Sequence, residues 1–331
     1  MKALIQMRKN YRTILKTIRP SGIFVALVII WLVMLFSSDI FRNLENLLSI
    51  LRESAFTGIC AIGITLCIIS GNLDLSVGSM LALLAVLNIM FLPQFGLVGS
   101  FLLVIFFGLI LGAFNGLLIA KGKIPSFITT LGTYYIFRAI AYMITNGDPV
   151  SFNEKWFTII GNGKLFGVPT PFIIFAILSI LGIFILKKTV FGRRILAIGN
   201  SLKASSISGI SIDNTVIGIY MIVGFFTSIC AILVSSRMWS ASAGLLEGYE
   251  FNVITIVVLG GTAFSGGSGS IANTFISAIF IATLTNCLNL FRVESFMMQI
   301  IKGLVLLIAF SIECVKPILI KKLNKVKLSN S

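Results

Sequence analysis

The chain has 331 residues, of which 57% are hydrophobic and 11% are charged, and its mean hydropathy is +1.05. Soluble domains are about half apolar and about a quarter charged, so this composition excludes an ordinary soluble protein. The sequence contains no His, which excludes Ser-His and Cys-His dyads and His-ligated zinc. We therefore predict an all-α polytopic membrane protein without a metal site, a cofactor or catalytic residues.

The formal net charge is +15, which on its own is compatible with a nucleic-acid partner. The Lys and Arg residues, however, cluster at both termini and in one central loop, as they do in the cytoplasmic loops of membrane proteins. We therefore expect a protein embedded in the lipid bilayer and no nucleic acid as a partner.

Residues 1–21 form a basic segment that is too long before the first apolar run for a secretory signal. Its apolar residues recur at helical spacing, which favours an amphipathic helix on the cytoplasmic face of the membrane. These residues are Tyr11, Ile14, Leu15 and Ile18. A disordered basic tail is the alternative interpretation.

A bilayer core of about 30 Å is crossed by about 20 helical residues. We predict about ten transmembrane helices, some of them broken, within a transmembrane domain over 22–315. The predicted spans are 22–38, 50–70, 75–92, 98–120, 126–145, 171–187, 214–236, 251–265, 271–290 and 297–315. Residues 316–331 form a basic tail.

The basic residues orient these spans. If both termini are cytoplasmic, the inner segments are 1–21, 71–74, 121–125, 188–213, 266–270 and 316–331, and they contain most of the Lys and Arg residues. The outer loops hold only Arg42, Lys155, Lys164, Arg237 and Arg292. The positive-inside rule therefore predicts cytoplasmic N- and C-termini and an even number of spans.

A polar, Gly-rich stretch, GNLDLSVGS at 71–79, interrupts an apolar run from Ser54 to Leu92. Irregular polar backbone at membrane depth is tolerated only inside protein or against a water-filled cavity. We therefore predict a helix break in or near a translocation pathway. Its candidate residues are Asn72, Asp74, Ser76, Gly78 and Ser79.

Asp74 is the strongest single candidate for a functional residue in this break. As a structural residue it would accept hydrogen bonds from amides at a helix N-terminus, with Ser76 nearby as a cap. As a functional residue it would contact a solute or a coupling ion. Both interpretations stay open at this point.

A second Gly-rich stretch follows the span at 251–265 and echoes the first one. Paired Gly-interrupted hydrophobic segments in two halves of a chain indicate a transport site, although Gly and Ser are also common where membrane helices pack closely. The candidates are Gly260, Gly261, Thr262, Ser265, Gly266 and Gly267.

Three hydroxyl-bearing residues, Thr129, Thr130 and Thr133, follow a basic inner turn and the helix-starting Pro125. They offer hydroxyls to a polar solute, but Thr in a helix more often bonds back to its own helix. Four charged residues, Arg52, Glu53, Arg138 and Lys302, lie in or near predicted spans, where an unpaired charge is costly. The sequence alone does not pair them.

The central inner loop at 188–213 is too apolar for a simple linker. Ile195, Leu196, Ile198, Leu202 and Ile207 predict a short helix that packs against something. A cytoplasmic partner and the chain's own bundle are equally good candidates. The chain contains no Gly-x4-Gly-Lys-Ser/Thr motif, so it is not expected to bind ATP through a P-loop.

Several motifs in series resemble the ribose-type monosaccharide ABC transporter permeases, within the larger superfamily of branched-chain amino acid and ribose-type inner-membrane permeases. The resemblance spans nearly the whole chain. It rests on GNLDLSVGS (71–79), KIPSFITTLGT (123–133), YYIFRAIAYMITNG (134–147), TVFGRRILAIGNSLKASSISGI (189–210), GYEFNVITIVVLGGTAFSGGSGSIANT (248–274) and IKGLVLLIAF (301–310). Asn72 stands where Gly is usual, and Ser126 where a second Pro is common.

The resemblance implies a roughly ten-helix, multi-pass subunit of the bacterial inner membrane that is not itself an enzyme. Its implied partners are a second permease subunit, identical or similar, a cytoplasmic ATP-binding subunit and an extracytoplasmic sugar-binding protein. The loop at 188–213 would be the ATPase-coupling segment. The residues implied for it are Phe191, Gly192, Arg193, Arg194, Gly199, Asn200, Ala204, Ser208 and Gly209.

We therefore predict the permease subunit of an ATP-driven importer for a monosaccharide, a ribose-like pentose or a hexose. The alternative is a stand-alone secondary transporter that couples a small polar solute to an ion or proton gradient. The sequence names neither the sugar nor the residues that contact it.

Overall fold

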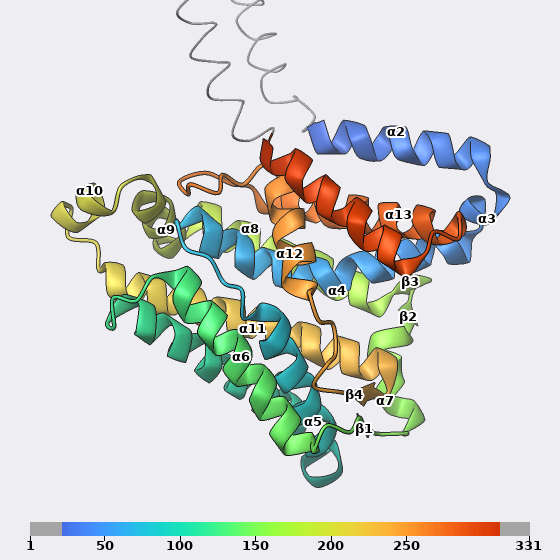
Figure 1. The fold of residues 1–331 in the computed structure, drawn as a ribbon, viewed down its shortest axis with the longest axis horizontal. Helices are drawn as coiled ribbons and strands as arrows, with labels where there is room; N and C mark the ends of the chain where they lie inside the picture. Colours follow the sequence, from blue (N-terminus) through green and yellow to red (C-terminus); the bar gives the residue numbers. More distant parts are fainter. Residues whose placement is uncertain (1–21, 312–331) are drawn as a thin grey trace, which may run out of the picture.

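The structure, a computed structural model, describes residues 22–311, and the predicted segments 1–21 and 316–331 lie outside the described residues. The described chain is a bundle of α-helices with four two-residue strands (Figure 1). The helices with labels are α2 (Gly22–Ser37), α3 (Asp39–Arg42), α4 (Leu44–Ile69), α5 (Val77–Ala120), α6 (Ser126–Thr145), α7 (Lys155–Asn162), α8 (Thr170–Lys188), α9 (Val190–Asn200), α10 (Leu202–Ile207), α11 (Ile212–Met238), α12 (Tyr249–Leu259) and α13 (Ile271–Leu290). One further apolar helix covers Ser295–Ser311.

The strands form two small antiparallel pairs. Strand β1 (Val150–Ser151) pairs with β4 (Ser240–Ala241), and β2 (Lys164–Leu165) pairs with β3 (Val168–Pro169). They lie in the connections between helices and contribute little to the core. The predicted all-α class is confirmed.

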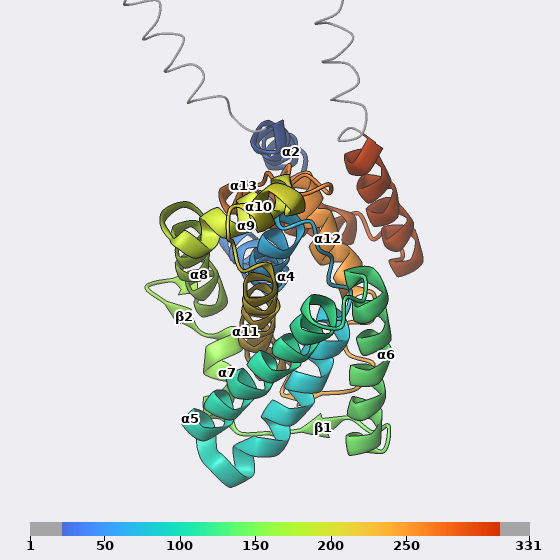
Figure 2. The ribbon, with the colours of Figure 1, turned by 90° about the vertical axis from the view of Figure 1, so that its left-hand side faces the viewer.

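Six of the described helices are long and apolar enough to cross a membrane by length and composition: α4, α5, α6, α8, α11 and α13. Helix α5 has 44 residues, which in a straight helix would measure about 66 Å, twice the thickness of a bilayer core. At Gly96, φ is +63°, and there the two halves of α5 fold back on each other (Figure 2). The predicted spans 75–92 and 98–120 are these two halves.

Shorter apolar helices account for the remaining predicted spans. They are α2, α12 and Ser295–Ser311. Helix α12 ends at Leu259 and has 11 residues, or about 16 Å, so the predicted span 251–265 is wrong in its second half. The helix stops there because Gly261 adopts a φ of +76°, which the Gly-Gly pair permits and most residues disfavour.

The core lies where α11 packs against α5 and α4 (Figure 2). The backbones approach closely because small residues face each other. A Cβ added at Gly224 would overlap the carbonyl oxygen of Gly108, and one added at Gly116 would lie 2.7 Å from Ile217 Cα. Such small-residue contacts are typical of helices that pack within a bilayer.

Large apolar side chains are exposed on the outer faces of the bundle. Phe36 on α2, Met143 on α6 and Ile180 on α8 are 86%, 78% and 68% exposed. A soluble protein rarely leaves so continuous an apolar surface open to water, whereas lipid covers it without cost. This surface agrees with a membrane-embedded bundle.

Candidate functional site

The predicted helix break is present and lies deep in the protein. Helix α4 ends at Ile69, the chain is non-helical to Ser76, and α5 begins at Val77. The segment runs from the α9 end of the bundle to the start of α5 in its interior (Figure 1). Asp74 and Ser76 are fully buried. Asp74 and Ser76 thus lie in the interior of the bundle and not at its surface.

Asp74 is held at the start of α5 by hydrogen bonds. Its Oδ1 accepts from the backbone N–H of Ser76 at 2.8 Å and from the Ser76 hydroxyl at 2.6 Å. Asn115, from the second half of α5, donates to the same hydroxyl at 2.9 Å. Asp74 therefore stabilises the turn into α5, whereas the Ser76 side chain does not cap the helix.

Two acceptor atoms in this cluster have no partner among the described residues. They are Asp74 Oδ2 and Asn115 Oδ1, and both are buried. A buried acceptor without a donor is costly, so the cluster has a place for a water molecule or a proton.

The backbone of Leu73 ties the break to two neighbouring helices. Its carbonyl accepts a hydrogen bond from the hydroxyl of Tyr220 on α11 at 2.8 Å, and its N–H donates to Ser126 Oγ on α6 at 3.2 Å. Ser126 is one of the two positions where the sequence departs from the pattern of the family that it resembles. Its hydroxyl gives the break an anchor that a proline would not provide.

The three Thr residues of α6 turn toward the interior and are buried. Thr130 donates to the carbonyl of Ser126 at 2.9 Å, and Thr133 donates to that of Thr130 at 3.3 Å. Both hydroxyls thus bond back to their own helix. Only the Thr129 hydroxyl has no partner among the described residues.

A buried carboxylate that sequence reasoning did not single out faces the start of α5. Glu250 lies in the first turn of α12 and is 4% exposed. A Cβ added at Gly78 would overlap Glu250 Oε2, so only Gly leaves room for the carboxylate there. The N-terminal ends of α5 and α12 therefore meet in the interior, and each attracts negative charge. The only sequence signal was an acidic residue at the head of an apolar run.

The second Gly-rich stretch forms the tight loop between α12 and α13. Gly260 follows the last residue of α12, and a Cβ there would lie 3.0 Å from Thr274 N.

Two buried hydroxyl groups, one from each Gly-rich stretch, differ in their hydrogen bonds. Ser79, from the first stretch, donates to Ser76 O at 2.9 Å. The hydroxyl of Thr262, from the second stretch, has no partner among the described residues.

Three stretches that are far apart in the sequence meet at one junction. Gly267 donates its N–H to the carbonyl of Ile69 at 2.8 Å, and Asn200 donates its side-chain amide to the carbonyl of Gly267 at 3.3 Å. A Cβ at Gly199 would overlap the Ile69 carbonyl oxygen, and one at Gly266 would lie 3.0 Å from Gly71 Cα. The break, the 260–270 loop and the predicted coupling segment thus form one contact.

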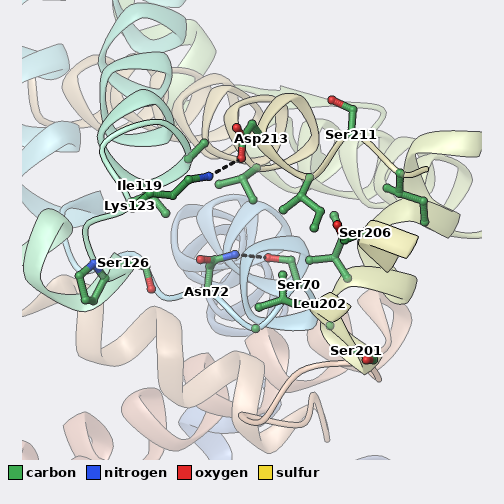
Figure 3. A pocket seen from close by; sticks show the side chains of 18 of the residues that line it. Ser70, Asn72, Ile119, Lys123, Ser126, Ser201, Leu202, Ser206, Ser211 and Asp213 are labelled. Atoms are coloured by element: carbon green, nitrogen blue, oxygen red, sulfur yellow. Dashed lines mark hydrogen bonds and ion pairs between the residues drawn. The ribbon is translucent and has the colours of Figure 1, made fainter. Parts of the chain in front are cut away.

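This junction borders a pocket of about 870 Å³, the inner pocket, shown in Figure 3. The segments predicted to be cytoplasmic around residues 71–74, 121–125 and 188–213 all contribute to it, together with Ser265. Asn72 lines it and donates to Ser70 Oγ at 2.9 Å. Across the pocket Lys123 and Asp213 form an ion pair at 2.9 Å. These three predicted inner segments therefore lie on the same side of the bundle.

The apolar spacing predicts one short helix in the coupling segment, and the structure has two, α9 and α10. Ile195 and Ile198 pack into the bundle, whereas Leu202 and Ile207 are 59% and 79% exposed. One face thus packs under the bundle and another is open.

The predicted coupling residues divide between these two faces. Phe191 packs toward the position of Gly218, and Gly192 is buried and donates to Thr189 Oγ1 at 3.1 Å. Arg193, Arg194, Ala204, Ser208 and Gly209 are exposed.

The structure also places the intramembrane charges. Glu53 pairs with Arg237 at 2.5 Å, and the Arg138 guanidinium donates to the carbonyl oxygens of Ala243 and Leu245. Lys302 makes no ion pair or hydrogen bond to any described residue. These partners lie on α11 and in the turn between β4 and α12, which the sequence alone did not place next to Glu53 and Arg138.

Comparison with known proteins agrees with this arrangement. Residues 46–310 match the family model for the permease component of branched-chain amino acid transport systems. The ribose import permease protein of Bacillus subtilis is 37% identical over 92% of this chain and 94% of its own. A probable ABC transporter permease protein of Escherichia coli is 36% identical over 88% of each chain. The xylose transport system permease protein of Haemophilus influenzae is 30% identical over 88% of this chain and 96% of its own.

No solved structure matches the chain. The family match covers most of the sequence and includes every element of the break, the junction and the coupling segment. With its long apolar helices, the chain is a multi-pass protein of the inner membrane and a transport subunit rather than an enzyme. Ribose import permeases are among its relatives. The chain belongs to the family of permease components of branched-chain amino acid transport systems.

Proposed function

We propose that this chain is the permease subunit of an ATP-driven importer for a monosaccharide of the ribose type. The similarity to ribose and xylose permeases over nearly the full length of both partners carries this proposal. The chain supplies the membrane pathway, and a separate subunit supplies ATP hydrolysis. The absence of a P-loop from the sequence agrees with this division.

The chain crosses the membrane about ten times, with both termini in the cytoplasm. The two halves of α5 count as separate crossings, α2 and the helix Ser295–Ser311 supply two more, and α12 crosses together with the loop at 260–270. The concentration of Lys and Arg near the inner pocket supports this orientation, because basic residues are retained on the cytoplasmic side.

The ATPase binds at α9 and α10. The exposed face of these helices carries two arginines, Arg193 and Arg194, next to the exposed apolar side chains of Leu202 and Ile207. A basic and apolar surface on the cytoplasmic side suits a protein partner. At the junction, Gly199 and Asn200 would pass a displacement of this surface to the break at 70–76.

A second permease subunit and a sugar-binding protein complete the importer. Asp74 shapes the inner part of the pathway by holding the start of α5. Further candidates for the pathway are Asn72, which lines the inner pocket, and Gly78, Thr129 and Thr262, which are buried.

Uptake into proteoliposomes tests the function. The chain is reconstituted with its ATPase and binding protein, and uptake of labelled D-ribose and D-xylose is followed. We expect uptake that needs both ATP inside and the binding protein outside. Uptake driven by a proton gradient without the ATPase would instead establish the secondary transporter, which no observation favours.

A further inference from the structure

A second pocket, the outer pocket, lies at the opposite end of α4 from the inner pocket. It has a volume of about 430 Å³ and is lined by α4, α11, α12, α13 and the helix Ser295–Ser311. Thr57 on α4 lines the outer pocket, and Ser70, which directly follows α4, lines the inner one. The separation of 13 residues between positions 57 and 70 corresponds to about 20 Å of helix. The α4 residues between them are buried, so packed side chains separate the two pockets.

Lys302 lines the outer pocket from the middle of the helix Ser295–Ser311. No ion pair or hydrogen bond joins its ammonium group to another residue of the described chain. A lysine at membrane depth is costly unless it has a partner or faces water or a ligand. The glutamate among the described lining residues, Glu53, is already paired with Arg237 at 2.5 Å.

Other polar side chains of the lining are also free to bind a ligand. Ser49, Thr57, Asn252 and Asn289 make no side-chain hydrogen bond within the part of the chain that the structure describes. Asn286, in contrast, is occupied by a reciprocal amide pair with Asn46 at 2.8 and 3.2 Å. The described lining therefore combines one unpaired cation, Lys302, with two free carboxamides and two free hydroxyls, while its other cation, Arg237, is paired with Glu53.

Aromatic and aliphatic side chains form the rest of the wall. Phe56 and Tyr249 line the pocket beside Ile50 and Val234. Small-molecule sites have volumes of about 300–1,000 Å³, with apolar walls and a few polar groups that fix orientation. A pocket of this size, with donors and acceptors on several walls, suits a molecule with several hydroxyl groups.

We propose that the outer pocket is a binding site for a monosaccharide on the pathway from the outer face, and that Lys302 and Asn252 hydrogen-bond its hydroxyl groups. The proposal rests on the proposed function, because it assigns the entry side of the same import pathway. The ammonium group donates to sugar oxygens, and the carboxamide both donates and accepts. The sugar thereby satisfies groups that the described protein leaves unpaired.

Transport by the complete importer tests the two residues. Lys302→Met removes the charge and keeps much of the length, and Asn252→Leu removes the carboxamide. We expect each variant to lower the maximal rate of ATP-dependent ribose uptake about tenfold, since a hydrogen bond to a charged group is lost with the first. Lys302→Arg should recover most of the rate. Lys187→Met, at an exposed lysine near the end of α8 that lines neither pocket, is the matched control and should behave like wild type.

Protection of an introduced thiol tests binding directly. Thr57→Cys is made in a Cys314→Ser background, because the four other cysteines are buried. In the complete importer, a charged methanethiosulfonate added outside should label Cys at position 57, and ribose delivered by the binding protein should slow the labelling. This assay does not depend on ATP-driven uptake, so it separates failure of the pocket from failure of the proposed function.

Three outcomes would overturn the proposal. One is normal uptake by Lys302→Met and Asn252→Leu. Another is labelling at position 57 that neither ribose nor xylose slows. A third is protection by phosphatidylglycerol in nanodiscs without any effect of sugar, which would make the pocket a lipid-headgroup site. Poor folding would appear as loss of ATPase co-purification, and Lys302→Arg and the labelling assay then decide the question.

Discussion

At the scale of single residues, glycines form the close contact between the coupling segment and the helix break. Gly199 on α9 lies directly on the carbonyl of Ile69, the last residue of α4. A Cβ at position 199 would also come within 2.5 Å of Gly267 N, which donates to that same carbonyl. Because backbone atoms form both contacts, no side chain can move aside to make room.

We therefore expect Gly199→Ala to lower the free energy of unfolding by about 1–3 kcal/mol, the usual cost of overpacking. The thermal midpoint of the purified, detergent-solubilised chain measures this loss. Gly132→Ala is the matched control, because no atom lies within 4 Å of its added Cβ. Ala is the better helix former, so Gly132→Ala should leave stability unchanged or raise it by about 0.5–1 kcal/mol. Equal midpoints for the two variants would contradict the close contact at Gly199.

Asp74 gives a second prediction at this scale. Its Oδ1 accepts both hydrogen bonds from Ser76, and an Asn side chain keeps an acceptor oxygen while an Ala side chain does not. Leaving the buried Ser76 donors unpaired costs about 1–3 kcal/mol. Asp74→Ala should therefore reduce membrane abundance and uptake strongly, and Asp74→Asn should reduce them less. Wild-type uptake by Asp74→Ala at normal abundance would show that the turn into α5 does not need the carboxyl group.

At the scale of elements, hydrophobic periodicity predicted most helices, because a membrane span of about 20 apolar residues is a strong signal. It failed at α12, where apolar residues continue beyond the helix end and only the positive φ of Gly261 stops the helix. Apolar spacing also predicted a short helix in the segment 188–213, where the structure has α9 and α10. Their packing could not be predicted, since the junction with Gly267 joins residues separated by 67 positions.

The open face of α9 leads to a prediction about assembly. Arg193 and Arg194 are exposed, and neither forms an ion pair with a described residue. Reversing both charges with Arg193→Glu and Arg194→Glu should weaken co-purification of the ATPase at least tenfold, because like or unpaired charges at an interface cost several kcal/mol. The permease itself should stay folded, since neither side chain is buried.

Arg292→Glu is the control for this experiment, because Arg292 follows α13 on the side predicted to be external. It should leave ATPase binding unchanged. Normal co-purification of the double variant would remove α9 from the ATPase interface.

At the scale of the whole molecule, the two pockets lie at opposite ends of α4 and α11. On α11, Val216 lines the inner pocket and Val234 the outer pocket. The sequence predicted the inner group, because motifs and basic residues mark it. It missed the outer pocket and Glu250, since their partners come from helices whose packing a single sequence does not reveal. Lys302 was noticed as an unpaired charge, but only the fold shows what it faces.

The orientation of these two ends is open to direct measurement. In a Cys314→Ser background the remaining cysteines are buried, so a new surface thiol is the only reactive one. Ser201→Cys lies between α9 and α10 at the inner pocket, and Lys164→Cys lies in β2 near Glu45 at the opposite end of α4. An impermeant maleimide added to intact cells should label Lys164→Cys and leave Ser201→Cys unlabelled, while inverted vesicles should give the reverse pattern. If both variants reacted from the same side, the ten-crossing topology would be wrong, because an α4 that spans the bilayer must separate them. Labelling of Ser201→Cys in intact cells would in addition overturn the assignment of α9 and α10 to the cytoplasm.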